Sequence, residues 1–356
     1  MYRIFVVKII ILFILTGCGG GGSSVENGSG GTQNIKPTSI SRPTPTAGDF
    51  VTYQRKAELR RGNAPPYTYV PYGEFTTNRV VFVNADSSYK QTETSHGYYP
   101  TPNSLPERIQ NTKAQVFFSS DHGLSAFYIF KDQYECRYTP PFRREPNLLT
   151  VGLIWSIETK ANCSVDGIPD SFTTTYQGKV LGLETITVPA GTFNTLKYEI
   201  TLKSANIESN PSAIVNCWKD TVTGLNVRCD QLPSASYPGV NSNELVGYSI
   251  AGLGKKNPPI ASYAGDWTGQ YSGNDQGNCK LKIDISGVIS GSCNGAKAGT
   301  FLISGLVKED ATITFNLKMG KETSATFNGQ FPSPQTLFGT WFNNNGFSGE
   351  WAFEHD

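Results

Sequence analysis

The most informative stretch of this 356-residue chain is Tyr263-Ala264-Gly265-Asp266-Trp267-Thr268-Gly269-Gln270-Tyr271-Ser272-Gly273. Apolar and polar residues alternate along it, and glycine recurs every few positions. Alternation with a period of two is typical of a strand that buries one face. About seven more runs of the same texture follow, with turn residues between them. Residues 262–356 are therefore predicted to form a small eight-stranded β-meander or barrel.

Residues 47–252 carry similar signals. Short runs rich in β-branched and aromatic residues, such as Val80-Val81-Phe82-Val83, are separated by Gly, Pro and Asn, which predicts a second β-rich domain. Its clearest unit is Val188-Pro189-Ala190-Gly191-Thr192-Phe193, where Pro presets φ and Gly supplies a positive φ at a turn. Residues 253–261, rich in Gly, Lys and Pro, are predicted to link the two domains. The predicted fold class is mostly β.

Residues 1–17 have the form of an export signal. Arg3 and Lys8 give a basic start, and the apolar run from Ile4 to Gly17 is shorter than the roughly 20 residues that a membrane-spanning helix needs. The run ends in Leu15-Thr16-Gly17-Cys18, which resembles the lipobox of bacterial lipoproteins. The resemblance implies cleavage before Cys18, a diacylglycerol on its sulfur and usually an N-acyl chain. The alternative is an ordinary signal peptide followed by a chance cysteine.

Residues 18–46 are predicted to be a flexible tether. They are rich in Gly, Ser and Pro and hold too few apolar side chains to bury a core. Gly19, rather than Asp, follows Cys18, and by the lipoprotein resemblance this is the usual pattern for export to the outer membrane. We therefore expect a lipid-anchored protein of the outer membrane that faces either the periplasm or the cell surface.

Net charge excludes some partners. The chain has 30 Lys and Arg residues against 29 Asp and Glu residues, and removal of the signal takes away two of the basic ones, Arg3 and Lys8. The mature chain is then close to neutral, so there is no electrostatic case for nucleic acid or for an anionic membrane surface. The predicted contact with the membrane is the lipid anchor alone.

The cysteines predict disulfides. With Cys18 assigned to lipid, an exported chain keeps an even number of cysteines, and the residues concerned are Cys136, Cys163, Cys217, Cys229, Cys279 and Cys293. Six cysteines allow 15 pairings, which the sequence alone does not distinguish. The simplest scheme joins neighbours in the chain: Cys136 to Cys163, Cys217 to Cys229 and Cys279 to Cys293.

Two resemblances extend these expectations. The Val188–Phe193 stretch, with Trp218 after Cys217, resembles exported bacterial proteins with a curved sheet of the lipoprotein-carrier type. This implies that residues 47–252 form a curved antiparallel sheet. The last domain resembles the Gly- and Trp-rich barrels that end exported bacterial proteins, and the C-terminal barrels of surface lipoproteins such as the transferrin-binding proteins. The matching pieces for the second likeness are Phe327-Asn328-Gly329-Gln330-Phe331 and Phe338-Gly339-Thr340-Trp341-Phe342.

The sequence offers little for catalysis. It holds three histidines, His96, His122 and His355. The serines and the aspartate beside His122 are its immediate neighbours, and adjacent residues do not face one another as a catalytic triad requires. No Cys-x-x-Cys pair occurs and no histidine lies near a cysteine in the sequence, so no metal site is expected. We expect no catalytic residue and no cofactor.

Trp267, Trp341 and Trp351 are the candidate ligand-binding residues, because all three fall on predicted strands of the last domain. Near one mouth of a hollow barrel they would line a pocket; in a filled barrel they would be core residues. The sequence leaves both alternatives open.

These observations predict a binding or structural lipoprotein whose partner is a protein, a glycan or a small apolar ligand. The alternative is a periplasmic carrier or assembly factor that shields lipidic cargo in the first domain. A hydrolase that uses an unrecognised pair of carboxylates is a further, weaker alternative.

Overall fold

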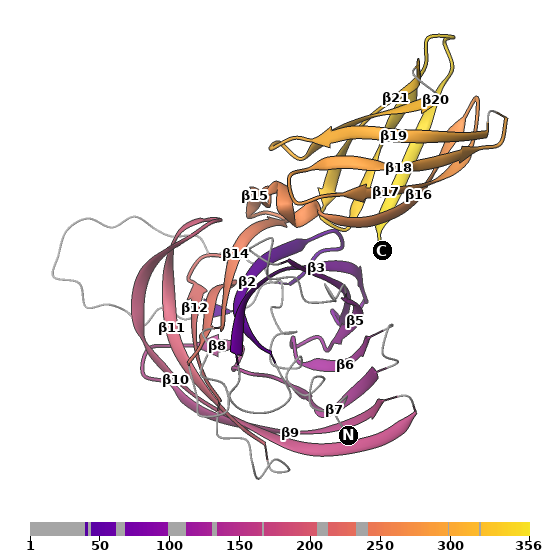
Figure 1. Ribbon diagram of the computed structural model, residues 1–356. Helices are drawn as coiled ribbons and strands as arrows, with labels where there is room; N and C mark the ends of the chain where they lie inside the picture. Colours follow the sequence, from indigo (N-terminus) through magenta and orange to yellow (C-terminus); the bar gives the residue numbers. More distant parts are fainter. Residues whose placement is uncertain are drawn as a thin grey trace. The chain divides into compact units, whose positions relative to one another are not determined.

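The protein is described by a computed structural model over residues 40–41, 44–61, 68–98, 112–129, 134–165, 167–204, 213–232, 241–297, 299–319 and 322–356. The chain divides into two compact units, residues 1–255 and 256–356. Each contains a closed antiparallel barrel (Figure 1). The predicted fold class, a curved antiparallel sheet followed by a small eight-stranded barrel, is confirmed.

The first barrel is built from twelve strands. They are β2 (Phe50–Arg61), β3 (Thr68–Val83), β4 (Tyr89–Tyr98), β5 (Thr112–Phe118), β6 (Leu124–Ile129), β7 (Tyr134–Phe142), β9 (Ile154–Val165), β10 (Ile168–Val188), β11 (Gly191–Ser204), β12 (Ala213–Asp220), β13 (Asn226–Gln231) and β14 (Asn241–Ile250). A further strand, β15 (Gly254–Lys256), lies beside β14. The predicted linker, residues 253–261, thus includes a strand of this sheet.

Two pairings of β14 close the first sheet. β14 pairs with its chain neighbour β13, in the register Cys229 to Asn243, and with the distant β2, in the register Leu245 to Tyr53. The sequence indicated a curved sheet, but it did not indicate this closure. A closed sheet leaves the strands of the ring without a free edge.

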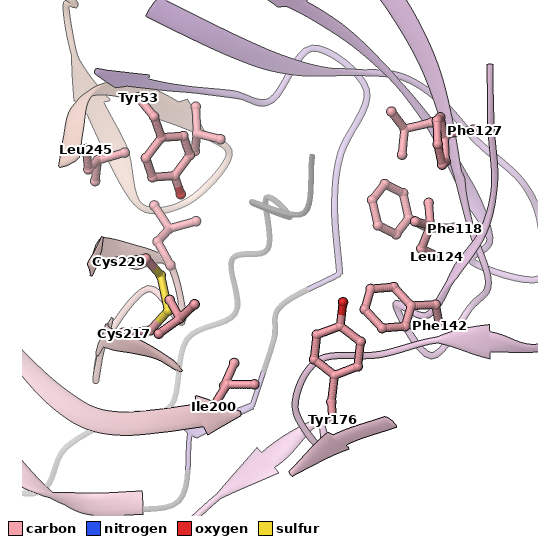
Figure 2. Close-up of a cluster of buried hydrophobic side chains, with 14 of the residues drawn as sticks. Tyr53, Phe118, Leu124, Phe127, Phe142, Tyr176, Ile200, Cys217, Cys229 and Leu245 are labelled. Carbon is pink, nitrogen blue, oxygen red and sulfur yellow. A yellow bond between two sulfur atoms is a disulfide. The ribbon is translucent and has the colours of Figure 1, made fainter. Parts of the chain in front are cut away.

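Side chains from opposite walls face into the first barrel. Figure 2 shows Tyr53 and Leu245 on one side, and Phe118, Phe127 and Phe142 on the other. All five belong to a single buried cluster. The pattern of β-branched and aromatic residues in the sequence places these side chains inside the barrel, and their burial is its main source of stability.

One end of the first barrel is occupied by the inner loop, which we define as residues 143–149. It follows β7 and contains the two-residue strand β8 (Leu148–Leu149), which pairs with β1 (Ile40–Ser41). Leu149 and Ile40 are both buried in the core cluster of this unit. The described part of the first unit therefore includes residues upstream of the predicted domain start at residue 47.

The second barrel has eight strands in simple sequential order, and it closes through a pairing of its first and last strands. The strands are β16 (Gly265–Gly273), β17 (Gly277–Ile283), β18 (Val288–Gly295), β19 (Gly299–Val307), β20 (Thr312–Met319), β21 (Glu322–Ser333), β22 (Thr336–Phe342) and β23 (Ser348–His355). A short 3-10 turn, η1 (Ile260–Tyr263), precedes them. Among the described residues, no helix is both long and apolar enough to cross a bilayer.

Candidate binding surface

A row of five side chains crosses the outer face of the second barrel. Gln270 on β16 is paired with Asn278 on β17, which is paired with Asn294 on β18. In the other direction Gln270 is paired with Ala352 on β23, which is paired with Phe338 on β22. Directly paired residues share a face of the sheet, and all five are exposed. We call this set the cross-strand row.

The surface is hollowed over the cross-strand row, and we call this hollow the trough. It consists of two adjoining depressions, with volumes of about 1020 and 590 Å³. Both are lined by Gln270, Asn278, Asn294 and Ala352. The shared lining makes the two depressions one continuous surface feature of β16, β17, β18 and β23.

Glycines on the inner side of the wall explain part of the hollow. A Cβ added at Gly277 would lie 2.6 Å from Cε1 of Tyr271, and one added at Gly295 would lie 2.6 Å from the Tyr271 hydroxyl. Such distances are too short for any side chain. Because Gly277 and Gly295 have no side chains, the Tyr271 ring can lie directly against the inner face of β17 and β18. These two strands therefore lie close to the barrel core.

The amides of the row are available to a ligand. The side chains of Gln270 and Asn278 make no hydrogen bond to any residue that the structure describes. The Asn294 Oδ1 accepts a hydrogen bond of 2.8 Å from the Thr300 hydroxyl, so its NH₂ group still faces solvent. An amide side chain offers both donors and acceptors. The row can therefore match a ligand that carries both kinds of group.

Charge lies beside the row and not within it. Glu350 borders one depression of the trough, and Lys280 and Glu354 border the other. Beneath the trough, burial and the nearby Asp275 carboxylate raise the pKa of Tyr271 to about 12. The Tyr271 hydroxyl is thus protonated at neutral pH, and it donates a hydrogen bond of 3.2 Å to Asp275 Oδ2. Tyr271 therefore adds no charge of its own beneath the trough.

The structure places the three predicted ligand-binding tryptophans in the barrel core. Trp267, Trp341 and Trp351 are 0%, 3% and 3% exposed. Their indole N–H groups donate to backbone carbonyls, those of Tyr263, Ser272 and Thr340 respectively. The rings pack against other aromatic side chains of the interior. Of the two alternatives, the geometry matches core packing, because a small barrel fills its interior with side chains.

The structure also contains three disulfides. They join Cys136 to Cys163, Cys217 to Cys229 and Cys279 to Cys293. Each connects directly paired residues of adjacent strands. Cys18, the predicted lipidation site, lies outside the described residues, as do the predicted signal peptide and most of the predicted tether.

Polar groups also gather inside the first barrel. The Lys219 Nζ lies 3.0 Å from Glu145 Oε1, and the Tyr198 hydroxyl donates to Glu145 Oε2 at 3.1 Å. Beside them, a cavity lined by His122 and the inner loop has a volume of about 10 Å³, roughly what one water molecule requires. These groups hold the inner loop in place, and they leave little room there for a ligand.

Sequence reasoning missed the cross-strand row. Gln270 lies in the most informative stretch of the chain, but its neighbours across the sheet could not be inferred from the sequence. Ala352 lies beside it only because the first strand of the barrel pairs with the last. The signal in the sequence that could have revealed the row is that Gln270, Asn278 and Asn294 all fall at outward positions of successive predicted strands. No cluster of three or more metal-ligating side chains occurs among the residues with described positions.

Comparisons with known proteins give distant likenesses only. No family model matches the chain. No curated protein matches it either. Among solved structures, the hypothetical lipoprotein YmcC from Escherichia coli aligns with 57% of this chain and 88% of its own, at 12% identity and a TM-score of 0.29.

Two further structures give similar results. An exported protein with a YmcC-like fold from Bacteroides fragilis aligns with 58% of this chain and 97% of its own, at 10% identity and a TM-score of 0.30. The isotype 1 transferrin-binding protein B from serogroup B Neisseria meningitidis aligns with 90% of this chain and 79% of its own, at 9% identity and a TM-score of 0.19. Likenesses of this size carry no argument about the function of this chain.

Proposed function

We propose that this protein is a lipid-anchored binding protein of the bacterial outer membrane that holds its ligand in the trough of the second barrel. The observation that carries the proposal is the trough itself, a continuous hollow lined by exposed and partly unpaired amides. A recessed surface with a few polar groups that converge on it is the default candidate for a binding site.

The anchor is part of the same proposal. The Leu15-Thr16-Gly17-Cys18 pattern supports lipidation at Cys18, with residues 1–17 removed as a signal and residues 18–46 serving as the tether. Two or three acyl chains on one cysteine hold a protein stably at a bilayer. The protein would then face the periplasm or the cell surface.

The alternative carrier role requires an accessible lumen in the first barrel. Side chains from opposite walls point into this barrel (Figure 2) and belong to one cluster of buried residues, and the inner loop occupies one end with a buried ion pair. Lipidic cargo at that end would have to displace this pair, at a cost of several kcal/mol per uncovered charge. The packing of the described residues therefore counts against the carrier.

A photo-crosslinking experiment tests the binding role. A photoreactive residue is placed at Thr340, which lines the trough, and at Asn316, an outward residue of β20 that does not line it. After irradiation in the native envelope, the Thr340 variant should give a crosslinked product that the Asn316 variant lacks. Identical products, or none from Thr340, would contradict a ligand in the trough.

Fractionation tests the anchor separately. The Cys18→Ala variant should be absent from the outer-membrane fraction, because neither processing nor lipidation can occur at alanine, whereas Cys217→Ala/Cys229→Ala should stay there. Recovery of Cys18→Ala with the outer membrane at the wild-type level would show that another feature anchors the chain.

A further inference from the structure

We propose that the trough binds an extended, neutral oligosaccharide that lies across the strands, with successive sugar units along the cross-strand row. This inference rests on the binding function proposed above and specifies the chemical class of its ligand.

The spacing of the row fits a sugar chain. Its members come from five neighbouring strands, β18, β17, β16, β23 and β22. Adjacent strands lie about 4.8 Å apart, and this distance is close to the advance of one pyranose unit in an extended polysaccharide. A chain laid across the strands would thus meet one side chain of the row per sugar unit.

The chemistry of the row fits sugar hydroxyls. A hydroxyl both donates and accepts hydrogen bonds, as does an amide side chain. Gln270 and Asn278 have no other described partner, so a ligand would not have to break existing side-chain bonds to reach them. The amides of three adjacent strands, completed by Asn294, form a continuous line of matching groups.

Phe338 supplies the apolar contact that a sugar ring needs. It ends the row and is 46% exposed, and the small side chain of Ala352 separates it from Gln270. The face of an aromatic ring carries partial negative charge, which attracts the C–H groups on the flat face of a pyranose. The combination of one exposed ring with a line of amides favours a glycan over a purely apolar ligand.

The same surface is poorly suited to other ligands. No member of the row is charged, so neither an anionic nor a cationic group finds a counter-charge at its centre. Exposed Trp, Tyr and Arg, which dominate the energetics of protein interfaces, do not line the trough; Tyr271 and Trp351 line it but are buried. An extended peptide cannot be added as another strand, because each strand of this barrel is already paired on both sides.

Calorimetric titration of the full chain with oligosaccharides tests the inference. The probes are linear neutral oligomers of glucose, galactose, xylose and N-acetylglucosamine, neutral glycans released from the envelope of the same cell, and acidic oligomers such as oligogalacturonate. We expect a neutral oligomer to bind, with an affinity that rises with chain length until the oligomer spans the row. The variant Gln270→Ala/Asn278→Ala should bind about tenfold more weakly, since it loses two hydrogen bonds.

The matched control is Asn316→Ala, which removes an amide from the outer face of the same barrel outside the trough. Its affinity should equal that of the wild type, although it also removes the hydrogen bond of 3.0 Å that Asn316 Oδ1 accepts from the Thr326 hydroxyl. The double variant, whose side chains have no other described partner, should keep the wild-type melting temperature. The inference is overturned if no neutral glycan binds, if the double variant binds like the wild type, or if acidic oligomers bind more tightly. A specific crosslink at Thr340 together with no glycan binding would overturn the ligand class and leave the binding function standing.

Discussion

Lys219 and Glu145 form an ion pair in which the Nζ–Oε1 distance is 3.0 Å, although their side chains are only 2% and 1% exposed. The pair joins β12 to the inner loop. It does not stand alone, because Lys219 also donates to the Gly224 carbonyl at 3.2 Å and Tyr198 donates to Glu145. A charged pair in so dry a place survives only when further hydrogen bonds satisfy it. The inner loop is therefore fixed electrostatically to the barrel wall.

Glu145→Gln should lower the free energy of unfolding by about 3 kcal/mol or more, because it leaves the buried Lys219 ammonium without the opposite charge of Glu145. The measurement is urea-induced unfolding followed by circular dichroism. Glu135→Gln is the control, since Glu135 pairs with Arg137 at the exposed surface and such pairs contribute about 0–1 kcal/mol. Equal effects of the two substitutions would refute a structural role for the buried pair.

The buried carboxyl group of Glu93 should make the free energy of unfolding decrease as pH rises above the acid range. Burial and, secondarily, the charge of Glu74 raise the pKa of Glu93 well above its usual value. The folded protein then keeps a proton on Glu93 that the unfolded chain releases above about pH 4.5. Above that pH the free energy of unfolding therefore falls as pH rises. The loss from this group is up to about 1.4 kcal/mol per pH unit until the folded pKa of Glu93 is passed.

Glu93→Gln, which removes this titration, should therefore raise the free energy of unfolding at pH 7 and leave it nearly unchanged at pH 4. Denaturant titrations at a series of pH values measure the difference between variant and wild type. Glu158→Gln, at an exposed position of β9, is the control and should follow the wild-type profile. A Glu93→Gln curve parallel to the wild-type curve would show that Glu93 ionises normally.

Gly178 lies directly opposite Trp155 on the neighbouring strand. A Cβ at residue 178 would overlap the indole ring, whose N–H donates to the Arg144 carbonyl of the inner loop at 3.0 Å. Gly178→Ala should therefore lower the free energy of unfolding by about 1–3 kcal/mol, as overpacked interiors do. Ser156→Ala, at the exposed position next to Trp155 in the chain, should change the free energy of unfolding little in the same urea titration. An unchanged free energy of unfolding in Gly178→Ala would mean that the Trp155 indole can move aside without an energetic cost.

The disulfide between Cys279 and Cys293 closes a loop with a sequence separation of 14. Loss of such a crosslink removes about 3 kcal/mol in the chain-entropy model. Cys279→Ala/Cys293→Ala should lower the melting temperature of the second unit and leave that of the first unchanged. Cys217→Ala/Cys229→Ala, with a separation of 12 in the first unit, should do the reverse. Scanning calorimetry resolves the two transitions, and a shift of both by either variant would contradict independent units.

Local patterns predicted the elements well, and the reason is physical. Along β16, Trp267 and Tyr271 are buried while Thr268 and Gln270 are exposed, as period-two alternation requires. The second barrel follows from eight such strands joined by short turns, because neighbours in sequence become neighbours in space.

Long-range pairings were beyond the sequence. The first barrel closes where Tyr53 meets Leu245, and the second where Gln270 meets Ala352. No local pattern specifies such partners, since register is set by the buried faces of strands that are far apart in the chain. The candidate site depends on the second of these pairings, so the sequence could supply its residues but not their assembly. The burial of Lys219 and Glu145 was hidden for the same reason.

The short pairing of Ile40 with Leu149 has a mechanical consequence for a protein held by a lipid at Cys18. A pull on the anchor would reach Leu149 before it reaches β2, the first strand of the barrel. The load would pass into the inner loop, and from there through Glu145 to Lys219 in the wall. If Cys18 carries the lipid, this pairing of two residues would break first under tension, while the strands of the barrel stay paired.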